Sequence, residues 1–91
     1  MIDDSLPGAD LVRQGIHDLE NGIESVPALL VAIGGAALRD VGVPVPEHTI
    51  REPEIRLYER LAAEHGNGAH TKFNAWIRQL SSFLRAARCV R

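Results

Sequence analysis

The sequence predicts an all-α protein: a small helical bundle of four or five helices in which the last helix is central. Three observations indicate this class. The stretch from Ala69 to Val90 repeats large apolar residues with helical periodicity. Serine, proline and glycine residues occur where helices are expected to begin and end. The composition, 45% hydrophobic and 24% charged, is typical of a globular protein and argues against disorder.

The length of 91 residues predicts a single domain, 1–91, because two cores would not fit. A domain of this size buries only about 60–65% of the surface that its unfolded chain exposes. We therefore expect modest stability, which oligomerisation would increase.

The first helix is expected after a flexible lead-in, residues 1–8, in which Ser5 is the candidate N-cap. It should run to about Asn21. Gly15 weakens its middle by roughly 1 kcal/mol unless another backbone packs closely there. Asp18 falls outside the apolar stripe, so we expect it on the surface.

A second helix is predicted after Ser25, a good N-cap, with Pro27 in its first turn. The segment 26–38 has no charged residue and should be buried nearly all round. Its 13 residues fall well short of the roughly 20 that a transmembrane helix needs, so we expect no membrane association.

Glycines and prolines divide the middle of the chain. Gly34 and Gly35 are expected to kink or break the second helix, and a short continuation through Asp40 should end at Gly42. The two prolines that follow disfavour a helix, so residues 43–52 are predicted to be a linker between two helical halves.

The next helix should begin at Pro53 and end at His65. Its apolar stripe is predicted to consist of Ile55, Tyr58, Leu61 and Ala62, with Leu57 to one side. Residues 66–68 read Gly-Asn-Gly, a tight turn, so this helix and the last should pack as an antiparallel hairpin.

The last helix should carry most of the aromatic surface of the core and pack against residues 26–38. Its large apolar residues occupy one arc of roughly 140° at 100° per residue. They are Phe73, Trp76, Ile77, Leu80, Phe83, Leu84, Ala87 and Val90.

Charge is unevenly distributed along the chain, although the net charge is only −2. Residues 1–65 hold all 12 acids and five arginines, a formal charge of −7. Residues 66–91 hold four arginines and one lysine but no acid, a formal charge of +5. This asymmetry indicates either an anionic partner for the basic segment or a fold that pairs the two parts.

Opposite the apolar arc of the last helix lies a row of polar and basic residues, here called the basic ridge. Its members are Asn74, Arg78, Ser81, Arg85 and Arg88. Guanidinium groups present paired donors to carboxylates and phosphates, so the basic ridge is the candidate partner-binding site. The alternatives are a solvated helix face, or one that pairs with acids of residues 1–65.

No catalytic or metal-binding set is predicted. His65 and His70 flank the 66–68 turn but lack the spacing of two histidines on one helix that makes zinc motifs specific. Ser25 is better explained as a cap, and Cys89 has only arginines as charged neighbours. We therefore expect no enzyme activity, no metal and no cofactor.

Two functions are consistent with these patterns. The first is a small protein-interaction module, such as a regulatory subunit, an antitoxin-like partner or a homodimer. The alternative is a nucleic-acid-binding regulator that uses the basic ridge, although the net acidity of the chain weakens it. A single cysteine, Cys89, and acids at the start of the chain predict a cytoplasmic location.

Overall fold

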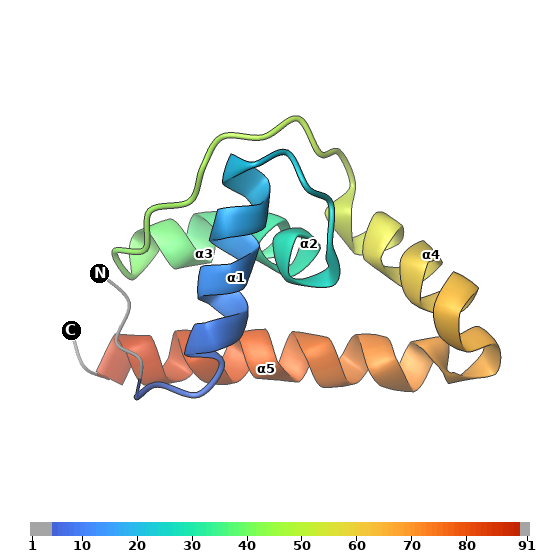
Figure 1. Ribbon diagram of the computed structural model, residues 1–91. Helices are drawn as coiled ribbons and strands as arrows, with labels where there is room; N and C mark the ends of the chain where they lie inside the picture. The colour runs from blue at the N-terminus through green and yellow to red at the C-terminus, as the bar shows by residue number, and fades with distance from the viewer. Residues whose placement is uncertain (1–4, 90–91) are drawn as a thin grey trace.

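The computed structural model describes residues 5–89, which form helices, turns and extended segments without a strand. The predicted all-α class is therefore confirmed. Figure 1 shows the longest helix along the base of the molecule and the others above it. In chain order the elements are α1 (Ala9–Glu20), α2 (Val26–Ile33), α3 (Gly35–Asp40), α4 (Pro53–His65), the 3-10 turn η1 (Gly66–Gly68) and α5 (Ala69–Cys89).

The hydrophobic core is centred on α2, which packs against α1, α4 and α5. Four consecutive residues of α2, from Ala28 to Val31, are at most 1% exposed. A helix that is apolar on every side needs neighbours on every side. This requirement explains why α1 and α4 flank α2 while α5 closes the core from below (Figure 1).

The start of α1 differs from the sequence prediction. Ser5 does not cap it; the helix begins at Ala9, after Gly8 in the left-handed conformation (φ 79°). A Cβ atom at Gly8 would lie 3.0 Å from the carbonyl oxygen of Gln79 and 3.3 Å from Cβ of Phe83. The turn before α1 is thus held against α5, and only glycine combines this conformation with so close an approach. Residues 1–4 of the expected lead-in lie outside the described residues.

Gly15 is the point where α1 crosses α2. A Cβ atom there would lie only 2.3 Å from the carbonyl oxygen of Pro27 and 2.4 Å from a methyl carbon of Val31. The close backbone approach that would justify a glycine in the middle of a helix is therefore present.

The predicted bounds of α2 and α3 are confirmed, but the segment 26–38 is less buried than expected: Ala36 is exposed, and Val26, Pro27, Ala32, Ile33 and Ala37 are only partly buried. The hydroxyl of Ser25 accepts a hydrogen bond from the amide of Ala28 at 3.2 Å, as an N-cap does. The helix is interrupted at Gly34, where the side chain of Leu80 from α5 fills the space beside the backbone. The continuation, α3, ends at Asp40, and the chain turns at Gly42 in the left-handed conformation (φ 87°).

Residues 43–52 contain neither helix nor strand and pass over the far side of α1 and α2 from α5 (Figure 1). Val43 is buried in the core and Ile50 packs against it. The segment therefore covers part of the core as well as joining α3 to α4.

The bounds of α4 were predicted correctly, and its predicted apolar stripe was right at Leu61 but wrong at Ile55, Tyr58 and Ala62. Leu57 and Leu61 are the buried residues, at 0% and 1% exposure. Ile55 is 53% exposed, Tyr58 is 41% exposed and Ala62 is also exposed. The helix is rotated so that its Leu57–Leu61 line faces α2, and this leaves the Ile55, Tyr58 and Ala62 face outside.

The predicted apolar arc of α5 faces the core. Leu80, Phe83 and Ala87 are buried, while Phe73, Trp76, Ile77 and Leu84 are partly buried against the core. Val90 lies outside the described residues. From η1, α4 runs back over α5 and leans away from it (Figure 1), and the two helices meet in a tilted ring contact between Tyr58 and Phe73, 5.7 Å between centroids.

Candidate partner-binding surface

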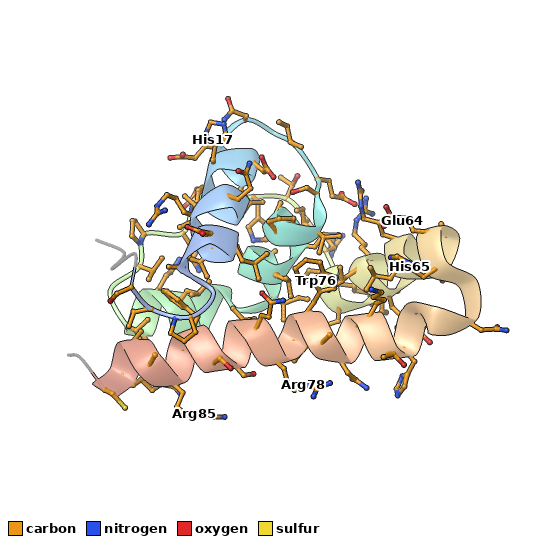
Figure 2. All side chains as sticks on the ribbon, turned by 60° about the horizontal axis from the view of Figure 1, so that its bottom comes forward. His17, Glu64, His65, Trp76, Arg78 and Arg85 are labelled. Atoms are coloured by element: carbon orange, nitrogen blue, oxygen red, sulfur yellow. The ribbon has the colours of Figure 1, made fainter. Side chains whose placement is uncertain are left out.

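The basic ridge follows from the way α5 packs. Because its apolar arc faces the core, the opposite arc of the same helix must face solvent. All five residues of the basic ridge are exposed: Asn74, Arg78, Ser81, Arg85 and Arg88. Figure 2 shows Arg78 and Arg85 directed away from the rest of the molecule. The basic ridge extends from Asn74 to Arg88, a separation of 14 residue steps or about 21 Å of helix at 1.5 Å per residue.

The arginines of the basic ridge form no ion pair with the acids of residues 5–65. Within residues 5–89, the ion pairs join Arg13 to Asp10 at 3.4 Å and Arg56 to Glu24 at 2.6 Å, and neither involves α5. The sequence left open whether acids of residues 1–65 would cover this face, and those of the described part of the chain do not. Of the five residues, Asn74 has a side-chain contact, 3.3 Å from its Nδ2 to Nε2 of His70 on the same face.

This arrangement suits the binding of an extended anionic surface. Three guanidinium groups at spacings of seven and three residues lie along one side of a straight helix. Each guanidinium can donate two parallel hydrogen bonds to a carboxylate or phosphate. Ser81 adds a short polar group between Arg78 and Arg85, and Asn74 adds another one turn before Arg78. The exposure agrees with the predicted solvated face, and the binding of a partner there stays a prediction.

The histidines are dispersed over the described part of the chain. Figure 2 shows His17 on α1 far from His65 at the end of α4. No group of three histidine, cysteine, aspartate or glutamate side chains among residues 5–89 is placed to hold a metal ion. Nδ1 of His48 accepts a hydrogen bond from the amide of Ile50 at 3.2 Å, which occupies one of its ring nitrogens.

A cavity of about 370 Å³ lies between the end of α1 and the segment 47–50. Apolar residues such as Ile23 line it together with the polar side chains of Glu24, Glu47 and His48. The carboxylate of Glu24 is already paired with Arg56. The cavity therefore presents Glu47 as its one unpaired carboxylate within the described residues.

Asp18 was expected on the surface and is instead buried, at 6% exposure. Its carboxylate accepts a hydrogen bond of 2.5 Å from the hydroxyl of Ser25 and one of 2.9 Å from the side-chain amide of Gln14. The Ser25 hydroxyl holds the pKa of Asp18 below its usual value; burial acts in the opposite direction, and Gln14 and His17 add to the lowering. Asp18, which lies on α1, thus holds the Ser25 cap of α2 in place through a hydrogen bond. No local pattern in the sequence predicts this contact.

The exposed apolar residues of α4 are the other feature that the sequence did not reveal. Ile55 and Tyr58 are two of the three large apolar side chains that are exposed within residues 5–89, and the third is Ile23. Isolated exposed apolar residues are common, but neighbours on one helix face form a patch.

Comparisons with known proteins provide no relative. No family model, no curated protein and no solved structure matches this chain. In the part of the chain that the structure describes, no helix has both the length and the apolar character needed to cross a membrane.

Proposed function

We propose that this protein is a non-catalytic protein-interaction module that docks an acidic surface of a partner protein on the basic ridge of α5. The observation that supports the proposal is the exposure of Arg78, Arg85 and Arg88 in one row, without an ion pair to any carboxylate of residues 5–89. A row of unneutralised guanidinium groups favours a partner of opposite charge.

The overall charge favours a protein over a nucleic acid as this partner. The chain carries a net charge of −2, and residues 1–65 alone carry −7. A nucleic acid is a continuous anion and would be repelled by the acidic remainder of the molecule. An acidic patch about 20 Å long on a protein requires attraction only along α5.

The proposal also includes a lack of catalytic activity and a cytoplasmic location, and particular side chains support each of these. The Ser25 hydroxyl is committed to the cap of α2 and to Asp18, and one ring nitrogen of His48 is bound to the backbone. These commitments fit a module without catalytic activity. The single Cys89 is exposed, as a thiol can remain in a reducing compartment, so we place the protein in the cytoplasm.

Affinity capture from native lysate, with and without nuclease, tests this function. The bait is compared with a variant that carries Arg78→Glu and Arg85→Glu. The matched control carries Arg51→Glu and Lys72→Glu, which change the net charge equally at exposed positions. Lys72 lies about 120–160° around α5 from Asn74, Arg78 and Arg85.

We expect one protein to be retained despite nuclease, with retention reduced about tenfold by the reversal on the basic ridge and unchanged by the control. Retention that nuclease abolishes would make the nucleic-acid alternative the correct one, and it should then fall steeply with salt. Retention that both variants reduce equally would show that only net charge matters and would contradict docking on the basic ridge.

A further inference from the structure

We propose that two copies of this chain form a dimer through the outward face of α4. This face, here called the α4 stripe, consists of Ile55, Tyr58 and Ala62 at spacings of three and four residues. Ile55 is 53% exposed and Tyr58 is 41% exposed. The α4 stripe is the helix face in residues 5–89 where exposed large apolar side chains lie next to each other.

The α4 stripe is held in place before any partner arrives. The ring of Tyr58 packs against that of Phe73 on α5, 5.7 Å between centroids and inclined at 56°. Phe73 is partly buried and packs against the core. A tyrosine whose ring is already fixed loses little side-chain entropy when it becomes buried.

A second copy is the occupant that this pattern fits, because the α4 stripe is complementary to itself. A two-fold axis that passes between the two α4 helices, at the level between Tyr58 and Glu59, places Ile55 of one copy opposite Ala62 of the other. The symmetry repeats this contact, so that Ile55 meets Ala62 on both sides of the axis, and the two Tyr58 side chains approach each other beside it. Large residues facing small ones allow two helices to approach to about 8 Å between their axes.

Two polar residues beside the α4 stripe fit the same antiparallel arrangement. Glu54 and His65 are exposed, eleven residues apart, and within about 20° of each other around the helix. The two-fold axis brings Glu54 of each copy near His65 of the other, where the carboxylate can accept a hydrogen bond from the imidazole. This hydrogen-bond complementarity favours antiparallel pairing with a second copy over an unrelated apolar partner.

Glu59 lies on the other side of the α4 stripe and near the axis, so its carboxylate approaches that of the other copy. Like charges in this position weaken the association. The apolar contact is also smaller than that of a permanent dimer, so the dimer should be weak and reversible. The dimer affinity should therefore respond to charge substitutions at Glu59.

The inference rests on the proposed function, because the dimer would be the form in which the protein-interaction module binds its partner. The basic ridge points away from the body of the molecule (Figure 2), so pairing through α4 leaves both copies of it free. A dimer would present two ridges to one partner assembly and gain avidity. The two surfaces lie on different helices, which allows each proposal to fail separately.

Sedimentation velocity from micromolar to millimolar concentration tests the dimer. We expect the wild-type chain to pass from monomer to dimer, and Ile55→Asp to weaken the dimer about tenfold or more. The control, Ile23→Asp, alters an isoleucine of similar exposure, 50%, outside α4 and should leave the dimer unchanged. The Arg78→Glu and Arg85→Glu variant should also dimerise normally. A wild-type chain that stays monomeric, or a dimer lost with the ridge variant, would overturn the proposal.

Disulfide formation tests the antiparallel register in a Cys89→Ser background. Facing Cα atoms should be about 4–6 Å apart, within reach of a disulfide. Oxidation of a mixture of Ile55→Cys and Ala62→Cys chains should therefore give covalent dimers between the two variants. Each variant alone should give few, since its own cysteines are offset by about 10 Å along the axis. Equal cross-linking in all three samples, or none in the mixture, would contradict this register.

A third experiment reverses the charge at Glu59 and tests whether this residue lies near the two-fold axis. Wild type mixed with Glu59→Lys should form a heterodimer more tightly than either chain forms a homodimer, because opposite charges then meet near the axis. Both homodimers retain like charges. A mixture no tighter than the two pure chains would place Glu59 away from the axis and exclude the proposed symmetry.

Discussion

The guanidinium of Arg56 donates two hydrogen bonds to the carboxylate of Glu24, at 2.6 and 3.0 Å, across 32 residues of sequence. This contact joins α4 to the turn between α1 and α2, and Arg60 adds a bond of 2.9 Å to the backbone carbonyl of Glu24. Together with the buried Leu57 and Leu61, it fixes the rotation of α4 about its axis. The rotation decides which apolar residues of α4 meet the core and which meet solvent.

Loss of this contact should loosen α4 selectively. Glu24→Gln removes the charge and one acceptor for the Arg56 guanidinium while the Arg60 bond to the backbone remains. We expect faster amide hydrogen exchange in α4 and unchanged exchange in α2, because the core residues of α2 are untouched. Glu20→Gln, an exposed acid at the end of α1, is the control. Equal acceleration in both helices would show that the contact supports the whole fold rather than α4.

The crossing of α1 and α2 should reject a side chain at Gly15. An added Cβ atom would lie 2.3 Å from the carbonyl oxygen of Pro27, which belongs to the backbone and cannot turn aside. Gly15→Ala should therefore destabilise the protein by about 1–3 kcal/mol in urea unfolding, despite a gain in helix propensity of about 1 kcal/mol. Gly35→Ala, with only the end of Arg39 at 3.6 Å, should be neutral or stabilising by up to about 1 kcal/mol. A stable Gly15→Ala variant would mean that the helices separate easily.

Asp18 should make the stability depend on pH in the acid range. Its pKa is lowered in the folded state, chiefly by the hydroxyl of Ser25, so the native protein favours the ionised carboxylate. The stabilisation is present above the ordinary pKa of 3.8 and is lost as the pH falls below it towards the lower folded value.

Urea unfolding at neutral pH and near pH 3 measures this dependence. Asp18→Asn should show a smaller loss of stability on acidification than the wild type. Asp10→Asn, whose carboxylate is exposed, should keep the wild-type dependence. Identical acid profiles for wild type and Asp18→Asn would exclude the role assigned to this carboxylate.

The aromatic residues of α5 should differ in their contribution to the core. Phe83 is 1% exposed, so Phe83→Ala should cost about 3–5 kcal/mol, a large part of the stability of a small domain. Phe73 is only partly buried, so Phe73→Ala should cost distinctly less. Thermal or urea unfolding of the two variants measures their stabilities. Equal losses of stability would mean that α5 packs against the core in a different orientation.

Local chemistry explains which parts of this fold the sequence predicts. Pro53 at the start of α4, Ser25 at the cap of α2 and Gly34 at the interruption act through their own backbone or that of near neighbours. Their effects can therefore be predicted from the sequence, and the observed boundaries of these helices agree with the predicted ones. The apolar period of α5 is equally local, and it predicts both the buried arc and the exposed ridge opposite.

The features that the sequence does not predict depend on contacts between distant residues. The sequence predicts a stripe of Ile55, Tyr58, Leu61 and Ala62 with Leu57 to one side. The face that carries Leu57 and Leu61 is equally regular, and only contacts with α2 and Glu24 decide which of the two is buried. Asp18 resembles any surface acid until the turn brings Ser25 back to it. Whether acids would cover the basic ridge likewise depended on where the tertiary fold places them.

An NMR titration tests most directly whether the basic ridge docks an acidic protein surface. Isotope-labelled protein is titrated with the partner retained in the capture experiment, and amide shifts are mapped onto the helices. We expect perturbations centred on Arg78, Ser81 and Arg85 that weaken as salt is added. Perturbations confined to other helices, with these three amides unchanged, would contradict it.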